Sequence, residues 1–284
     1  MPAPVYAVLV TIDKAYIPPL KVMLRSLLRS NPDAVFSIYV LHSSLHVEDM
    51  REIAAGLDEN RCRFYYIRAG DDLPGDAPIT ERYPKEMYYR IFAARYLPDA
   101  LDRVLYLDPD LVVINSIAAL YELELGDCFF AAASHVQRAM QKLNEIRLDM
   151  EEPCPYINSG VMLMNLRKLR QEQEFKEVYR YIETHKARLL LPDQDVISGL
   201  YASRILPIDP FRFNMTERLF FLRRGAECRM SLDWVRENTT IVHYCGRNKP
   251  WKKNYIGKLD IFWKEAECAF NRYRRRKVNG GVIC

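Results

Sequence analysis

Several features that would narrow the function at once are missing from this chain of 284 residues. No stretch approaches the roughly 20 consecutive apolar residues that cross a bilayer. The seven cysteines are scattered and form no C-x-x-C pair, which argues against a zinc site and favours reduced intracellular thiols. The beginning of the chain lacks the positive n-region of a secretory signal. We therefore expect a cytoplasmic protein whose membrane contact, if any, is peripheral and at the inner face.

The composition excludes disorder as the main state, because 49% of the residues are hydrophobic and 27% are charged. The formal net charge of +4 is unevenly distributed, with 15 Lys and Arg against 6 Asp and Glu from Arg223 onward. A basic end attracts phosphate-bearing ligands, anionic lipid or nucleic acid. No recognised nucleic-acid motif accompanies it, so we do not expect a nucleic-acid partner.

Strand-like and helix-like runs alternate through the first half of the chain. Strands are expected at 5–10, 36–42, 62–67 and 103–107, with helices at 20–30 and 47–57. Such alternation predicts βαβ units and an α/β fold with a mostly parallel central sheet. Ligands bind beyond the carboxyl ends of the strands in such sheets, where the strand order reverses. With no repeat or linker in the sequence, one continuous domain over residues 1–258 fits best.

The second half begins with an expected loop at 151–156 and a strand at 160–166, followed by three predicted helices. A long charged helix is expected over 167–189, and a short one follows at 193–201 with Asp193 as its N-terminal cap. Apolar and aromatic residues recur at helical spacing from Leu259 to Arg276, opposite basic ones. This basic C-terminal helix, within an appendage over residues 259–284, is expected to pack on the domain. A peripheral membrane role through the same tail is the alternative.

The stretch YLDPDLVV, from Tyr106 to Val113, places two aspartates directly after an apolar strand. Residues i and i+2 of an extended chain point to the same face, so Asp108 and Asp110 can converge on one ligand. Buried carboxylates need a compensating cation, and two on one face suit Mg²⁺ or Mn²⁺. A solvated turn with Asp110 as a cap would explain a lone D-x-D equally well.

The stretch HYCGRNKPW, from His243 to Trp251, supplies groups that complement these aspartates. His243 follows an apolar strand and offers a nitrogen ligand, and mixed N/O ligation slightly favours Mn²⁺ over Mg²⁺. Gly246 allows a phosphate to approach the backbone closely, and Lys249 places a positive charge beside it. Taken alone, a core histidine and a surface lysine are the simpler interpretations.

Six blocks of sequence in a fixed order resemble the retaining glycosyltransferases of family eight, which include glycogenin and bacterial lipopolysaccharide galactosyl- and glucosyltransferases. The blocks are VTIDKAY, YYRIFAARYLPD, VLYLDPDLVV, INSGVMLMNL, LPDQD and HYCGRNKPW, and they cover nearly the whole chain. The resemblance implies a GT-A type nucleotide-binding fold and a UDP-hexose donor, glucose or galactose, held through Mn²⁺.

The resemblance also assigns roles to residues. Metal ligands are expected at Asp108, Asp110 and His243, and the groups around the anomeric centre are expected at Asp193 and Gln194. The remaining donor-binding positions are Thr11, Asp13, Tyr16, Arg90, Asn158, Ser159, Gly246 and Lys249. Ala15 and Ser159 depart from residues found in some relatives, which leaves the choice of hexose open.

The implied reaction is transfer of the hexose to a saccharide acceptor, for which a lipopolysaccharide or other lipid-linked envelope glycan is expected. Front-face attack would use Gln194 to stabilise the sugar, whereas double displacement would use Asp193 as the nucleophile. Two other functions remain open at this point. DPDLV fits the D-x-D-x-V pattern of a phosphohydrolase, and a catalytically silent UDP-sugar-binding protein would share the same fold.

Overall fold

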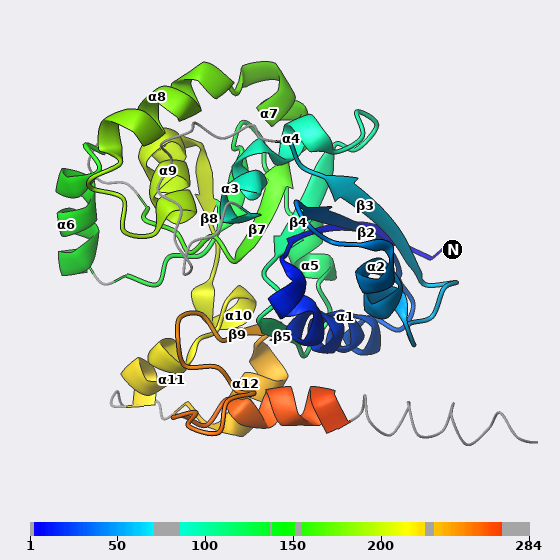
Figure 1. Ribbon diagram of the computed structural model, residues 1–284. Coiled ribbons are helices and arrows are strands. Elements are labelled where there is room, and N and C mark those ends of the chain that lie inside the picture. The colour runs from blue at the N-terminus through cyan, green and yellow to red at the C-terminus, as the bar shows by residue number, and fades with distance from the viewer. Residues whose placement is uncertain (1–2, 71–85, 137, 151–154, 225–229, 269–284) are drawn as a thin grey trace, which may run out of the picture.

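A seven-stranded sheet forms the centre of the computed structural model, which describes residues 3–70, 86–136, 138–150, 155–224 and 230–268 (Figure 1). The strand order is β3-β2-β1-β4-β7-β6-β8. In this order the strands are Cys62–Arg68, Val35–His42, Val5–Thr11, Arg103–Leu107, Val161–Asn165, Phe130–Ala132 and Ile205–Pro207.

The four strands from β3 to β4 are all parallel, which confirms the mostly parallel sheet. Strand β7 is antiparallel to both of its neighbours, β4 and β6, while β6 and β8 are parallel. The chain adds β2 and β3 on one side of β1 and then places β4 on its other side. The strand order therefore reverses between β1 and β4, where a crevice at the carboxyl ends is expected.

Helices cover both faces of the sheet, so that it separates two apolar cores. Along β1, Val8 and Val10 face one core and Ala7 and Leu9 face the other, as the two-residue period of a strand requires. The helices that contribute to the first core are α1 (Ile17–Ser30), α2 (Val47–Ala54) and α5 (Ala118–Tyr121). Those of the second are α3 (Glu86–Tyr89), α4 (Ala93–Tyr96), α7 (Leu166–Glu172), α8 (Phe175–His185) and α9 (Pro192–Tyr201).

The long helix expected over 167–189 is wrong, because the structure divides it into α7 and α8. Gln173 adopts an extended backbone between the two helices. Its buried side-chain amide donates hydrogen bonds to the Ile91 carbonyl at 3.0 Å and to the Tyr201 hydroxyl at 3.2 Å. These tertiary contacts outweigh the helical propensity of the charged stretch.

The cap expected at Asp193 is also wrong. Helix α9 begins at Pro192, so Asp193 lies within its first turn. Asp195 instead satisfies the free amides at this end, because its Oδ2 accepts hydrogen bonds from the N–H groups of Leu190 at 2.6 Å and Leu191 at 3.0 Å. The Asp193 side chain is thereby left available for a different set of contacts.

A third apolar cluster lies beneath the sheet, around a two-stranded sheet of β5 (Leu111–Val113) and β9 (Ile241–His243) (Figure 1). The helices of this lower region are α10 (Pro210–Phe213), α11 (Glu217–Arg224), α12 (Leu232–Asn238) and a helix at 260–268. Helix α6 (Arg138–Arg147) lies at the left edge of the molecule, and η1 (Lys14–Tyr16), η2 (Arg90–Phe92) and η3 (Ala202–Arg204) are short 3-10 turns.

The aromatic face expected on the last helix packs on the domain as far as the structure describes it. Leu259, Phe262, Trp263 and Ala266 are buried in the third cluster together with Val112 of β5. Residues 269–276 of the expected helix and residues 151–154 of the expected loop lie outside the described part of the chain. The division into domains at residue 259 stays a prediction. In the described part, no helix has both the length and the hydrophobicity that crossing a membrane requires.

Candidate active site

The candidate site lies at the carboxyl ends of β1 and β4, where the strand order reverses. Asp108 follows the last residue of β4, and Asp110 directly precedes β5. Because β7 is antiparallel to β4, its beginning lies at this same end, with Val161 opposite Leu107. The Asp108 amide donates a hydrogen bond to the Gly160 carbonyl at 2.8 Å. Sheet pairing thus brings the segment 158–160 beside the two aspartates.

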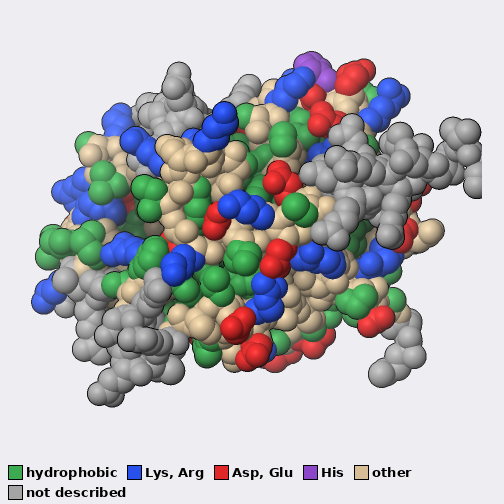
Figure 2. Space-filling view, turned by 90° about the horizontal axis from the view of Figure 1, so that it is seen from below, with side chains coloured by type: hydrophobic (Ala, Val, Ile, Leu, Met, Phe, Trp, Pro, Cys, Tyr) green, Lys and Arg blue, Asp and Glu red, His purple; other side chains and the backbone are tan. Residues whose placement is uncertain are grey.

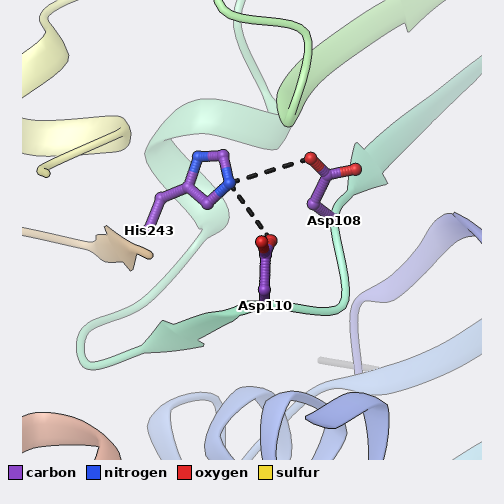
Figure 3. A group of neighbouring side chains, drawn as sticks. All are labelled: Asp108, Asp110 and His243. Atoms are coloured by element: carbon purple, nitrogen blue, oxygen red, sulfur yellow. Dashed lines mark ion pairs between the residues drawn. The ribbon is translucent and has the colours of Figure 1, made fainter. Parts of the chain in front are cut away.

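Asp108, Asp110 and His243 meet in one group, as the sequence predicted (Figure 3). Leu111 pairs with His243 across β5 and β9, which places the imidazole opposite the aspartates. The imidazole Nε2 lies 3.2 Å from Asp110 Oδ1 and 3.7 Å from Asp108 Oδ2. One ligand atom from each residue lies within 4.8 Å of the others. Two carboxylate oxygens and one imidazole nitrogen suit a divalent cation such as Mn²⁺ or Mg²⁺.

Two further observations fit a metal ion at this group. Asp110 Oδ1 and His243 Nε2 are buried, and neither has a hydrogen-bond partner. Buried polar atoms without partners are rare and costly, and a cation between them would satisfy both. Gly160 leaves the required space, since a Cβ there would lie 2.3 Å from His243 Cε1 and 2.6 Å from Asp108 Oδ2.

Arg90 joins the aspartates to other predicted site residues in what we call the charged network: Thr11, Arg90, Tyr106, Asp108, Ser159 and Asp193. Arg90 Nη1 lies 3.0 Å from Asp108 Oδ1 and 3.2 Å from Asp193 Oδ2, and its guanidinium lies over the Tyr106 ring. Tyr106 donates a hydrogen bond to Asp108 Oδ1 at 2.7 Å and lies 3.0 Å from the Thr11 hydroxyl. The network fixes Asp108 from the side opposite His243.

Asp193 is the most deeply buried carboxylate of this network, with 1% of its surface exposed. Its Oδ2 accepts a hydrogen bond from the Ser159 hydroxyl at 2.8 Å, in addition to the contact with Arg90. Burial raises the pKa of the Asp193 carboxyl, and the Arg90 charge opposes that effect only in part. The Asp193 side chain is therefore already engaged on the protein side.

Asp110 has the opposite electrostatic balance. Burial alone would raise the pKa of its carboxyl, but the Lys249 ammonium holds this pKa well below the usual range. Lys249 is itself buried, forms a salt bridge to Asp110 Oδ2 and donates a hydrogen bond to the Tyr244 carbonyl at 2.9 Å. The predicted phosphate-binding lysine thus lies directly beside the metal group.

A second set of contacts, the amide network, consists of Asn158, Gly160, Gln194, Asn214 and His243. The Gly160 N–H donates to Asn158 Oδ1 at 3.2 Å, and Asn214 Nδ2 donates to the same oxygen at 3.0 Å. Asn214 Oδ1 lies 2.9 Å from His243 Nδ1, and Asn158 Nδ2 donates to Gln194 Oε1 at 3.4 Å.

This chain of contacts fixes the tautomer of His243. A backbone N–H can only donate, so Asn158 must present Oδ1 to Gly160, and Asn214 must then present Nδ2 to Asn158. Asn214 Oδ1 is left to accept the proton of His243 Nδ1. In the neutral imidazole Nε2 then carries the free lone pair and points at the aspartates, which is the form of histidine that binds a metal.

Four residues of the site were not among those the sequence pointed to: Tyr106, His135, Gly160 and Asn214. Burial lowers the pKa of His135 to about 3, so its ring is neutral, and its Nε2 contacts the Asn214 carbonyl at 2.8 Å. Tyr106 and Gly160 lie in motifs already noted, but their roles depend on contacts across the sheet. Asn214, which is completely buried, lies in a stretch that carries no motif.

Besides Lys249, three of the remaining donor-binding positions lie outside both networks. The Asp13 carboxylate caps η1 by accepting hydrogen bonds from the N–H groups of Ala15 at 2.8 Å and Tyr16 at 3.2 Å. Tyr16 is partly buried, and burial raises its pKa; Lys249 and Asp110 also influence that pKa, which places the phenol near them. Gly246 has a φ of +83° and open space at its Cβ position, so its backbone is exposed to solvent.

A cavity of about 480 Å³ opens beside this group. Its lining includes His243 of the metal group together with Asn158 and Gln194 of the amide network. The rest of the wall comes from residues 135–136, 156–157, 190–191 and 216, from α6 and α11, and from the segment 244–255. Asp193 does not belong to the lining, whereas Gln194, its neighbour in the sequence, does.

Comparison with known sequences gives a family match over most of the chain. The profile of Glycosyl transferase family 8 matches residues 7–255. A lipopolysaccharide 1,2-glucosyltransferase of Escherichia coli K12 is 26% identical over 242 residues, which cover 85% of this chain and 71% of that enzyme. A lipopolysaccharide 1,3-galactosyltransferase of Salmonella typhimurium is 24% identical over 245 residues, which cover 84% and 71%.

Comparison with solved structures gives the same result for the fold. A galactosyltransferase, LgtC, determined in complex with donor and acceptor sugar analogs, is 25% identical with a TM-score of 0.80, covering 93% of this chain and 95% of that one. A Streptococcus pneumoniae glycosyltransferase, GlyE, has a TM-score of 0.69 at 22% identity, covering 97% and 64%.

Proposed function

The chain belongs to glycosyltransferase family 8 and has the GT-A fold, and from this premise we propose that it transfers glucose or galactose from a UDP-sugar to a saccharide acceptor. One observation supports the proposal above all others. Asp108, Asp110 and His243 converge on one another, and His243 lines a cavity of about 480 Å³ that Asn158 and Gln194 also line. This cavity is within the size range of sites for small ligands.

Asp108, Asp110 and His243 would hold a divalent cation, with Mn²⁺ favoured over Mg²⁺ by the nitrogen ligand. When bound, such a cation supplies positive charge that offsets the charge of a departing diphosphate. Lys249 adds a second positive charge beside Asp110, and the exposed backbone at Gly246 offers room for a phosphate. Thr11, Asp13 and Tyr16 lie at the end of β1, where they would contact the uridine and ribose.

Gln194 is better placed than Asp193 to act at the anomeric carbon. Gln194 lines the cavity, whereas Asp193 is buried behind it and is bound by Arg90 and Ser159. A carboxylate that is paired and out of contact with the cavity is a poor nucleophile. The arrangement therefore favours front-face attack over double displacement, with Gln194 stabilising the sugar and Arg90 and Ser159 fixing the wall of the site.

The acceptor proposed is a lipopolysaccharide or another lipid-linked envelope glycan, assembled at the cytoplasmic face of a membrane. The support comes from relatives that are lipopolysaccharide glucosyl- and galactosyltransferases. The basic residues of the C-terminal tail, which lie mostly outside the described residues, would add a peripheral membrane contact. Neither the phosphohydrolase nor the silent-binding interpretation gains support from the comparisons.

The donor can be tested without knowledge of the acceptor. The purified chain is incubated with Mn²⁺ and a panel of UDP-sugars, and slow hydrolysis is measured as release of UDP. We expect hydrolysis of UDP-glucose or UDP-galactose that stops when the metal is chelated. Release of phosphate from phosphomonoesters, with no UDP-sugar turnover, would support the phosphohydrolase instead. Binding of UDP without hydrolysis or transfer would support the silent-binding protein.

Asp108→Ala is the matched variant for this assay. It removes a proposed metal ligand at a position that is partly exposed, so we expect loss of UDP-sugar turnover by at least about a hundredfold while the fold is retained. Circular dichroism and the urea unfolding midpoint check the fold. Normal Mn²⁺-dependent turnover by this variant would contradict the assignment of the site.

A further inference from the structure

Exposed hydrophobic side chains lie on the segments that line the cavity, and two of them, Met140 and Leu190, belong to its lining. Three segments that line it also carry large apolar side chains turned to solvent: α6 with residue 190, α11, and the segment 244–257. These side chains are Met140, Leu143, Ile146, Leu190, Phe221, Leu222, Trp251 and Ile256. Among the described residues, the other large hydrophobic side chains with similar exposure are Val5, Val47, Tyr65 and Ile261. We call the first set the rim.

The geometry of α6 shows how the rim continues from the cavity. Met140, Asn144 and Arg147 line the cavity, as residues on one face of a helix at spacings of three and four do. Leu143 and Ile146 lie on the adjacent stripe and are 59% and 65% exposed. An apolar stripe that packs against nothing costs solvation, and such patches mark surfaces that contact another molecule.

Among the described residues of α6, α11 and the segment 244–257, the exposed charged side chains are all basic. Lys142, Arg218, Arg247, Lys252 and Lys253 are exposed, and no ion pair that joins described residues uses them. Figure 2 shows hydrophobic and basic side chains intermixed along the left edge of the underside, the side on which Figure 1 places α6 and α11. The acidic side chains in this view gather toward its centre and right.

We propose that the rim docks on the surface of an anionic lipid bilayer, with the mouth of the cavity facing the membrane. Apolar side chains flanked by lysine and arginine are the combination that inserts at a membrane interface while cations contact lipid phosphates. Trp251 is suited to that interface, because its ring packs on Trp263 while 36% of the residue remains exposed to solvent.

This inference rests on the proposed function, and it makes that function more specific. A lipid-linked acceptor would keep its lipid in the bilayer while its saccharide enters the cavity directly. The rim differs from the C-terminal tail, because it consists of residues that surround the site rather than residues beyond 268. The two membrane contacts can therefore be separated by mutation.

The test is co-sedimentation of the full chain with phosphatidylcholine vesicles, with and without phosphatidylglycerol. We expect pelleting only with the anionic vesicles. Leu143→Ser with Ile146→Ser, and separately Phe221→Ser with Leu222→Ser, should each weaken vesicle binding by about tenfold. Lys252→Glu with Lys253→Glu should weaken it by about fivefold or more for each cation removed.

The matched control is Arg63→Glu with Tyr65→Ser on β3, at the opposite edge of the sheet, and it should pellet like the parent chain. All rim variants are at exposed positions, so urea unfolding should be nearly unchanged. Equal pelleting by parent, rim and β3 variants would overturn the proposal. Loss of binding only after deletion of residues 269–284, with rim variants unaffected, would also overturn it and assign the contact to the tail.

A second readout separates this proposal from the proposed function. Hydrolysis of the UDP-sugar in free solution should be the same for the rim variants and the parent, because they touch neither the metal group nor Gln194. A chain that binds anionic vesicles through the rim but hydrolyses no UDP-sugar would support the docking surface and contradict the function. A chain that hydrolyses UDP-sugar but does not bind the vesicles would support the function and contradict the docking surface.

Discussion

Two networks of side chains meet at the group of Asp108, Asp110 and His243. One holds its metal-group residue with ion pairs, and the other does so with hydrogen bonds between neutral groups. The charged network holds Asp108 through an ion pair with Arg90 and a hydrogen bond from Tyr106. A second ion pair joins Arg90 to Asp193. The amide network holds His243 through Asn214 and Asn158, whose side chains are neutral. Both networks are mostly buried, with one partly exposed member each, Asp108 and Asn158, so the difference lies in chemistry rather than in depth.

Mutations in the two networks should therefore have different main effects, one on stability and the other on metal affinity. Removal of a buried cation leaves its carboxylate partners unpaired, which mainly costs stability. Removal of a neutral amide leaves no charge behind, but it frees the imidazole to rotate or to change tautomer, which mainly costs metal affinity. The predictions that follow test this division, from the largest expected effect to the smallest.

Arg90→Met should produce the largest loss of stability, about 3–5 kcal/mol, because it leaves the buried carboxylate of Asp193 and the partly buried carboxylate of Asp108 without their shared partner. The free energy of unfolding in urea measures the effect. Arg51→Met, at an exposed arginine of α2, is the control and should change stability by less than about 0.5 kcal/mol. A similar small change for Arg90→Met would show that the charged network does not depend on this residue.

Gly160→Ala should damage both networks, because Gly160 lies where they meet. The added Cβ would lie 2.3 Å from His243 Cε1, so the imidazole or Asp108 must move, at a cost of about 1–3 kcal/mol and with loss of metal binding. Gly246→Ala is the matched control. It has open space but a φ of +83°, so it should cost about 1–2 kcal/mol of stability and leave metal affinity intact. Equal metal affinities for the two variants would contradict the geometry.

Asn214→Leu should weaken Mn²⁺ binding by about 10- to 100-fold while stability changes less than in Arg90→Met. Isothermal titration calorimetry measures the metal affinity, and Asn60→Leu in an exposed turn is the control. Nitrogen NMR of the imidazole should show the proton on Nδ1 of His243 in the parent chain. Asn214→Asp keeps an acceptor for that proton and should retain the tautomer. A proton on Nε2 with none on Nδ1 in the metal-free parent would refute the role given to Asn214.

The two acids with shifted pKa values should respond to pH in opposite directions. The folded-state pKa of Asp110 lies below its unfolded value, so its contribution to stability is present above the usual carboxyl range and is lost as pH falls through the folded pKa. The folded-state pKa of Asp193 lies above its unfolded value, so acidification relieves an unfavourable charge. At acid pH, Asp110→Asn should make the free energy of unfolding less dependent on pH, and Asp193→Asn should make it more dependent on pH. Urea unfolding at a series of pH values, without metal, measures both effects. Changes in the same direction would contradict the two environments.

The charged half of the site was largely predictable from the sequence. Asp108 and Asp110 stand at the end of an apolar strand, where α/β sheets place ligands, and the blocks around Arg90 and Ser159 have a recognisable order. The first three strands and their helices were also predicted within a residue or two at most boundaries, because apolar periodicity in a parallel sheet is a local signal.

The neutral half could not be predicted, because its contacts depend on the path of the chain. Asn214 lies 29 residues from His243 and 56 from Asn158 in sequence, and nothing near it marks a site. Gln173 interrupts a predicted helix for a similar reason, since its partners belong to η2 and α9. The misplaced cap at Asp193 was an error of another kind, in which a local rule was applied to a residue whose partner, Arg90, is distant in sequence.

The central claim is that Asp108, Asp110 and His243 hold one divalent cation that in turn holds a nucleotide diphosphate. Electron paramagnetic resonance of Mn²⁺, titrated with the chain in the presence and absence of UDP, measures this most directly. We predict one bound Mn²⁺ per chain, tighter binding with UDP, and loss of both in Asp108→Asn and His243→Ala. Undiminished Mn²⁺ binding by those two variants, or a Mn²⁺ affinity that UDP leaves unchanged, would contradict the account.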